Sequence, residues 1–73
     1  MFEKIRKILA NETSIDEEEI TMTSSIHEDL GVDSMDMYNL MDVLEDSFQL
    51  KIPEDSKLVT VGDIVKLIEE LQK

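Results

Sequence analysis

The chain has 73 residues, of which 18 are acidic and seven basic, so its formal net charge at pH 7 is −11. This length predicts a single domain, residues 1–73, and leaves little room for a catalytic cleft. The charge argues against nucleic acid binding through phosphates, and the absence of cysteine excludes disulfides and thiolate metal sites. No segment approaches the ~20 apolar residues that span a bilayer, and the charged first residues do not resemble a signal peptide. We therefore expect a cytoplasmic monomer that is not inserted in a membrane.

The first predicted element is a helix from Phe2 to about Asn11, because apolar residues recur there at helical spacing. Residues 15–32 form a long segment with spaced apolar side chains. A structureless loop of that length is uncommon in a compact domain. We expect this segment to pack on the helices, with a short helical turn near Asp16 to Glu19.

The second main helix is predicted from Ser34 to Phe48, after Gly31 and with Asp33 as its N-cap. The sequence Asp33 to Asp36 resembles a capping box, with an acidic residue three positions after the cap. Its core-facing side has apolar residues at i, i+3, i+4 and i+7 spacing. These residues are Met37, Leu40, Met41, Leu44 and Phe48.

Two further helices are predicted near the C-terminus. Pro53 favours the first turn of a short helix from Pro53 to Lys57. Thr60 to Asp63 form a capping box for the last helix, and Val59 and Ile64 are placed for a hydrophobic staple. The last helix has an apolar stripe, and no segment alternates long enough to make a strand. The predicted fold class is therefore all-α: a small four-helix bundle of three main helices and a short third one, with a long first loop.

Acidic residues are concentrated in residues 8–50, which contain twelve acids and neither lysine nor arginine. A field of one sign attracts basic partners and speeds their encounter, although it also serves simply as a solubilising surface.

Ser34 is the candidate functional residue. A serine in the first helical turn often only assists capping, but a phosphate ester there would lie beside unpaired backbone N–H groups and the positive end of the helix dipole. A serine nucleophile needs a base, and the only histidine, His27, lies seven residues upstream, where we expect a solvated loop residue. The sequence therefore predicts a protein that is not an enzyme, and any chemistry on Ser34 has to be performed by another protein.

The residues around Ser34 carry a family resemblance, which extends over nearly the whole chain. Residues 30–36, Leu-Gly-Val-Asp-Ser-Met-Asp, resemble the signature of acyl carrier proteins. The likeness continues through Leu40, Leu44-Glu45, Phe48, Ile52-Pro53 and Thr60-Val61-Gly62-Asp63.

The resemblance implies that Ser34, next to Asp33, receives a 4′-phosphopantetheine arm from coenzyme A through a phosphopantetheinyl transferase. The thiol of the arm then carries acyl chains as thioesters between enzymes of fatty acid biosynthesis, or of related polyketide or lipid metabolism. The resemblance also implies acyltransferase, synthase and reductase partners with basic patches.

The resemblance implies two further sets of site residues. The partner-binding residues would be Met35, Asp36, Asp42, Glu45 and Asp46. The acyl-pocket candidates, for which ordinary core packing is an equal alternative, are Met37, Met41, Leu44, Ile64 and Ile68. Asn39 stands where family members commonly have glutamate, and Asp42 where they commonly have an apolar residue. These departures leave open a specialised carrier beside a housekeeping one.

Two alternatives remain at this stage. The Asp-Ser-Met triplet also occurs in carriers of amino acids, of the D-alanyl or peptidyl type. The other alternative is an acidic cation-binding module. A calcium loop needs oxygen ligands at alternate positions and glycine at the sixth, whereas the loop that would begin at Asp33 has methionine at positions three and five and tyrosine at six. We therefore expect no built metal site.

Overall fold

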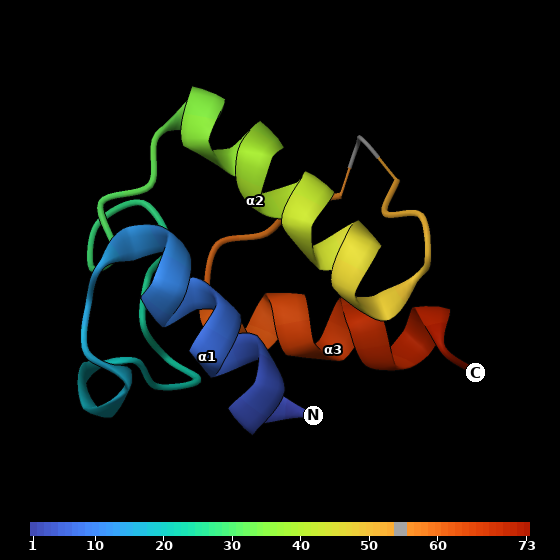
Figure 1. The fold of residues 1–73 in the computed structure, drawn as a ribbon, viewed down its shortest axis with the longest axis horizontal. Helices are drawn as coiled ribbons and strands as arrows, with labels where there is room; N and C mark the ends of the chain where they lie inside the picture. The colour runs from blue at the N-terminus through green and yellow to red at the C-terminus, as the bar shows by residue number, and fades with distance from the viewer. Residues whose placement is uncertain (54–55) are drawn as a thin grey trace.

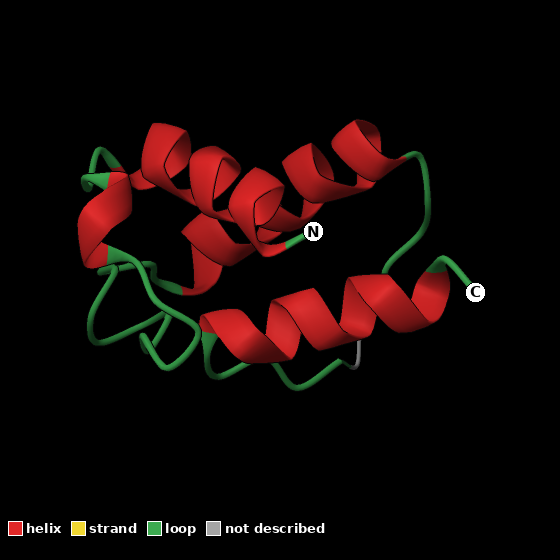
Figure 2. Cartoon of the chain, turned by 90° about the horizontal axis from the view of Figure 1, so that it is seen from below, coloured by secondary structure: helices red, strands yellow, loops and turns green. Residues whose placement is uncertain are grey.

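The structure is a computed structural model that describes residues 1–53 and 56–73. Within these residues the chain forms three α-helices and one turn of 3₁₀ helix (Figures 1 and 2). The elements are α1 (Phe2–Thr13), η1 (Glu17–Glu19), α2 (Ser34–Phe48) and α3 (Val61–Leu71). In Figure 2, α3 lies on one side of the molecule and α1 and α2 on the other. The predicted all-α fold class is confirmed.

The predicted bounds hold closely for α2 and η1 and less well for α1. The first helix continues to Thr13, two residues beyond the predicted end. The Thr13 hydroxyl donates to the Leu9 carbonyl at 2.7 Å, and Ser14 ends the helix in the left-handed conformation with φ 62°. The predicted short helix from Pro53 to Lys57 includes residues 54–55, which lie outside the described residues, so it stays a prediction.

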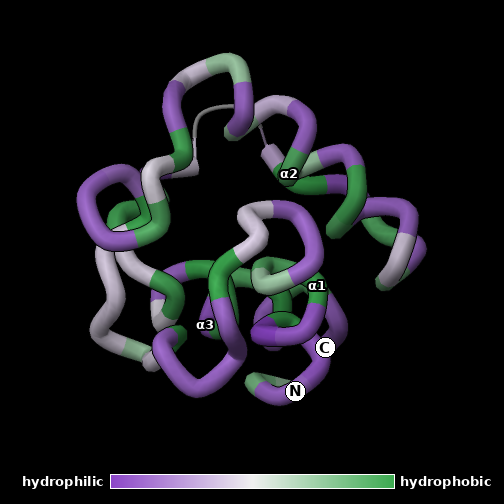
Figure 3. The backbone as a smooth tube through the Cα atoms, turned by 60° about the vertical axis from the view of Figure 1, so that its left-hand side comes forward, coloured by the Kyte–Doolittle hydropathy of each residue, from purple (hydrophilic) through white to green (hydrophobic). Residues whose placement is uncertain are grey.

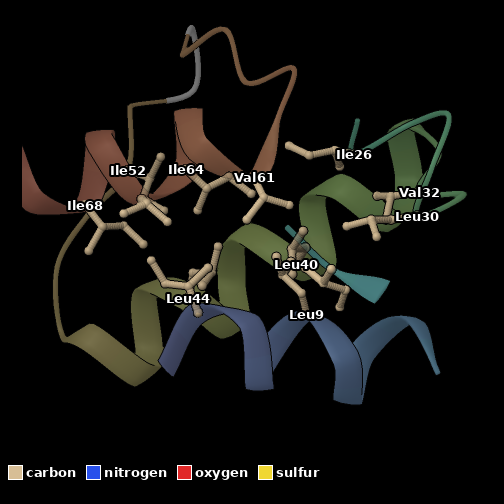
Figure 4. Packing of buried hydrophobic residues seen from close by; sticks show 13 residues of the cluster. Leu9, Ile26, Leu30, Val32, Leu40, Leu44, Ile52, Val61, Ile64 and Ile68 are labelled. Carbon is tan, nitrogen blue, oxygen red and sulfur yellow. The ribbon is translucent and has the colours of Figure 1, made fainter. Parts of the chain in front are cut away.

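Buried side chains from all three α-helices and from the long first loop form one core (Figure 4). The helices contribute Ile5, Leu9, Leu40, Leu44, Val61, Ile64, Val65 and Ile68, and the segment after α2 contributes Ile52. The loop between η1 and α2 adds Ile20, Ile26, Leu30 and Val32. The prediction that this loop packs on the helices is therefore confirmed, although Met22 remains 43 % exposed. Figure 3 shows that hydrophilic and hydrophobic residues alternate along α2, as its amphipathic pattern requires.

Backbone hydrogen bonds join the long loop to the start of α3. The N–H of Ile26 donates to the Val59 carbonyl at 2.9 Å, and the N–H of Val61 donates to the Ser24 carbonyl at 3.0 Å. The N–H of Gly62 donates to the Met22 carbonyl at 2.8 Å. The loop consequently fixes where α3 begins.

The capping box of α3 is confirmed, because Thr60 Oγ1 accepts from the Asp63 N–H and Asp63 Oδ2 accepts from the Thr60 N–H. The predicted staple is wrong, since Val59 is 59 % exposed. The Val59 N–H donates to Asp63 and its carbonyl accepts from Ile26. Both backbone groups are thus committed to neighbouring segments, and the side chain remains outside the core. Among residues 1–53 and 56–73, no helix combines the length and the apolarity needed to cross a membrane.

Candidate functional site

Ser34 is the first residue of α2, and its side chain is exposed. Figure 1 shows this end of α2 projecting from one edge of the molecule. Asp33 caps the helix, because its Oδ1 accepts from the Asp36 N–H at 2.8 Å and its carbonyl accepts from the Met37 N–H at 2.9 Å. The Ser34 oxygen is therefore accessible to another protein at the site where the sequence analysis places it.

The first turn of α2 is suited to a negatively charged substituent. The N–H groups of Ser34 and Met35 have no preceding intrahelical acceptor, and the helix dipole is positive at this end. Met35 is 81 % exposed, so its side chain does not cover the turn. A phosphate ester on Ser34 would thus be placed beside donors and a favourable dipole, each contact contributing about 0.3–1 kcal/mol.

A groove of about 660 Å³ begins at Ser34 and follows α2 toward the segment after it. Among the residues that the structure describes, six of the lining residues come from α2, five are residues 51–53, 56 and 58, and one, His27, comes from the first loop. Its lining residues are His27, Ser34, Met37, Tyr38, Met41, Asp42, Glu45, Lys51, Ile52, Pro53, Ser56 and Leu58. The groove therefore extends from the candidate attachment residue, and its walls are partly apolar.

Two of the five acyl-pocket candidates, Met37 and Met41, line this groove. Leu44, Ile64 and Ile68 are fully buried in the core and do not line it. A pocket role for these three residues stays a prediction.

Sequence reasoning missed several groove residues. Tyr38 and Lys51 both line the groove, and Tyr38 is 74 % exposed. Tyr38 is four residues after Ser34, so helical spacing alone would have placed it on the same face. Lys51 comes from the segment after α2, and no local pattern in the sequence predicts where that segment folds back.

The acidic residues of α2 differ in exposure and in hydrogen bonding. Asp36, Asp42 and Asp46 are exposed. Glu45 is half-buried, and its Oε2 accepts from the Ile52 N–H at 2.6 Å. Glu45 therefore holds the segment after α2 against the helix, in addition to any role in partner binding.

Asn39 has an intramolecular partner. Its side-chain amide donates to Glu12 Oε2 at 3.1 Å and so joins α2 to the end of α1. A glutamate at position 39 would place two carboxylates together instead.

His27 is exposed, as expected, but it is not simply solvated. Its Nδ1 hydrogen-bonds the Val32 carbonyl, and the ring lines the same groove as Ser34. In the part of the chain that the structure describes, no group of three or more histidine, cysteine, aspartate or glutamate side chains is placed to hold a metal ion.

Comparison with known proteins gives matches over almost the whole chain. The family described as "Phosphopantetheine attachment site" matches residues 3–71. A protein of Campylobacter lari named "Acyl carrier protein" is 41 % identical over 75 residues, which cover 100 % of this chain and 97 % of that protein. A protein of the same name from Clostridium perfringens is 42 % identical over 72 residues, or 96 % of this chain and 95 % of that protein. A third, from Campylobacter curvus, is 40 % identical over 75 residues.

Proposed function

The chain belongs to the acyl carrier protein family, and from this premise we propose that Ser34 is the residue that receives the 4′-phosphopantetheine arm. Membership makes the protein a carrier and not an enzyme. The observation that supports Ser34 is its position: it is exposed, it begins α2, and a groove leads away from it.

The residues around Ser34 fit the arm in chemistry as well as in shape. The first turn of α2 offers N–H donors for the phosphate, and the groove offers both polar and apolar walls for the chain that follows. When bound, the arm supplies a thiol that carries acyl groups as thioesters. Methionines such as Met37 and Met41 suit a wall that has to adapt to different chains, because their side chains are unbranched and flexible.

In the proposed attachment, the Ser34 hydroxyl loses its proton and its oxygen forms a bond to phosphorus, while the pyrophosphate bond of coenzyme A breaks and adenosine 3′,5′-bisphosphate leaves. No hydrogen bond between Ser34 Oγ and a basic side chain occurs among residues 1–53 and 56–73. The transferase therefore has to supply the base.

The exposed acids of α2 are the proposed docking surface for partner enzymes, which membership in the family implies. Asp36, Asp42 and Asp46 lie on the same helix as Ser34, and Met35 adds an exposed apolar side chain beside it. Basic patches on a transferase, acyltransferase, synthase or reductase complement such a surface and raise the rate of encounter. We propose acyl chains of fatty acid biosynthesis or a related lipid or polyketide pathway as the cargo, and the cytoplasm as the location.

The attachment site is tested by incubating the protein with coenzyme A and a phosphopantetheinyl transferase and measuring intact mass. The wild type should gain one phosphopantetheine, and Ser34→Ala should gain none. Ser47→Ala, which changes another exposed serine of α2, is the matched control and should be modified like the wild type. A modified Ser34→Ala protein, or an unmodified wild type with an active transferase, would overturn the proposal.

A further inference from the structure

His27 and Ser34 come from different segments but line the same groove. His27 lies in the first loop, and its ring is tied to the residue two positions before Ser34, because Nδ1 hydrogen-bonds the Val32 carbonyl. Val32 itself is buried, and its N–H donates to the Ile26 carbonyl at 3.1 Å. The ring is therefore attached to the core on the side from which α2 begins.

The bond to Val32 fixes the tautomer of the ring. A carbonyl oxygen can only accept, so Nδ1 carries the proton and donates it. In the neutral ring, Nε2 is then the nitrogen with the lone pair. When the ring is protonated, Nε2 becomes a second donor with positive charge, and it can bind an anionic oxygen.

Several of the acidic side chains that line the groove or flank the ring already accept backbone hydrogen bonds. Asp29 is engaged, since its Oδ2 accepts from the Ser25 N–H at 2.7 Å, and Glu45 is engaged by Ile52. Among residues 1–53 and 56–73, the titratable groups that line the groove or flank the ring are Glu28, Asp29, Asp33, Tyr38, Asp42, Glu45 and Lys51. Of these, Lys51 is the one other basic group, and it belongs to the segment after α2.

We propose that His27 is a positioning residue for the arm: its Nε2 binds the phosphodiester that joins Ser34 to the pantetheine chain, while Nδ1 holds the ring on Val32. This inference rests on the proposed attachment at Ser34. A phosphodiester keeps one negative charge at neutral and mildly acidic pH, because it has no second acidic proton. The contact therefore forms when the imidazole is protonated, and it directs the arm toward the groove.

Two variants separate the two ring nitrogens. In His27→Asn the side-chain amide nitrogen occupies the place of Nδ1, so the bond to Val32 is kept and the Nε2 donor is lost. In His27→Gln the amide nitrogen occupies the place of Nε2, so a neutral donor to the phosphate is kept and the bond to Val32 is lost. A merely structural role predicts that His27→Asn behaves like the wild type.

The test uses the modified proteins and starts with intact mass, which confirms that each carries one phosphopantetheine. The ³¹P resonance of the phosphodiester and the side-chain ¹⁵N resonances of His27, which report the protonation of the ring, are then followed together through a pH series. In the wild type, the ³¹P resonance should move together with the ¹⁵N resonances as the ring gains its proton, and attachment of the arm should move the Nε2 resonance. His27→Asn should abolish the pH-dependent ³¹P shift. His27→Gln should keep its ³¹P resonance displaced from that of His27→Asn, by an amount that does not change with pH.

The outcomes distinguish this inference from the proposed function. If the wild type is modified on Ser34 but the ³¹P resonance is the same in the wild type and in His27→Asn throughout the pH series, the role of His27 is refuted and the attachment site stands. If the wild type is not modified at all, both proposals fail together.

Discussion

The starts of α2 and α3 have the same local pattern and opposite surroundings. Each helix has a polar N-cap, Asp33 or Thr60, whose side chain accepts from the N–H of an aspartate three residues later. At the start of α3 the first helical residue, Val61, is fully buried. At the start of α2 the first helical residue, Ser34, is exposed.

The difference arises from the first loop and not from the helices. The loop donates or accepts backbone hydrogen bonds at the start of α3, including an isolated bridge between Ser25 and Thr60. At the start of α2 the same loop passes underneath, through buried Leu30 and Val32, and leaves the first turn uncovered. One helix start therefore anchors the fold, while the other is exposed. Matched substitutions at equivalent positions can break this contrast.

The largest difference in stability is expected from substitutions at the second residue of each helix. A Cβ on Gly62 would lie 2.9 Å from the Met22 carbonyl oxygen, so Gly62→Ala has to displace the loop and its hydrogen bond. We expect the free energy of unfolding to fall by up to about 3 kcal/mol. Met35→Ala changes the equivalent residue of α2, which is 81 % exposed, and should cost within about 0.5 kcal/mol. Urea unfolding measures both, and equal losses would refute the contrast.

The first helical position gives the next largest effect. Val61→Ala removes two buried methyl-sized groups and should lower the free energy of unfolding by about 2 kcal/mol, because the transfer term is about 0.8 kcal/mol for each and a cavity remains. Ser34→Ala should leave stability within about 0.5 kcal/mol of the wild type while it abolishes modification. A strongly destabilised Ser34→Ala protein would mean that Ser34 also has a structural role.

The sequence predicts the features of these helix starts that depend on neighbouring residues, and it does not predict those that depend on distant segments. The extent of α2 and the capping box at Thr60 follow from periodicity and spacing within a few residues, and both are confirmed. The staple at Val59 was wrong because its backbone is bonded to Ile26, more than 30 positions away.

The candidate site shows the same limit. Helical spacing and the family signature place Ser34, Met37 and Met41 on one face of α2. The bonds from Asn39 to Glu12 and from Ile52 to Glu45 depend on how separate segments meet, and the sequence gives no local signal for either. The second of these bonds engages Glu45, whereas Asp36, Asp42 and Asp46 are exposed.

The N-caps are expected to give a smaller difference. Thr60→Ala removes the acceptor for the Asp63 N–H at a half-buried position and should cost about 1 kcal/mol. Asp33→Ala removes the acceptor for the Asp36 N–H, which is exposed, so water can replace it and the cost should be about 0.5 kcal/mol. Thermal unfolding of the two variants at the same pH and salt compares them. A larger loss for Asp33→Ala would show that the start of α2 depends on its cap more than that of α3.

The smallest effect depends on pH and involves the third position of each helix. The backbone N–H groups of Thr60 and Val59 both donate to Asp63 Oδ2 at 3.0 Å and hold the pKa of that carboxyl below its usual value. A carboxyl whose pKa is lower in the folded state contributes stability above the unfolded value of about 3.9, and this contribution is lost as the pH falls through the folded pKa. The stability difference between the wild type and Asp63→Asn should therefore be largest near neutral pH and shrink below about pH 4. Asp36→Asn, at the equivalent position of α2, is the control, because no hydrogen bond to the Asp36 carboxylate occurs among residues 1–53 and 56–73. Equal pH dependence of the two variants in urea unfolding would mean that the bonds to Asp63 do not distinguish the two helix starts.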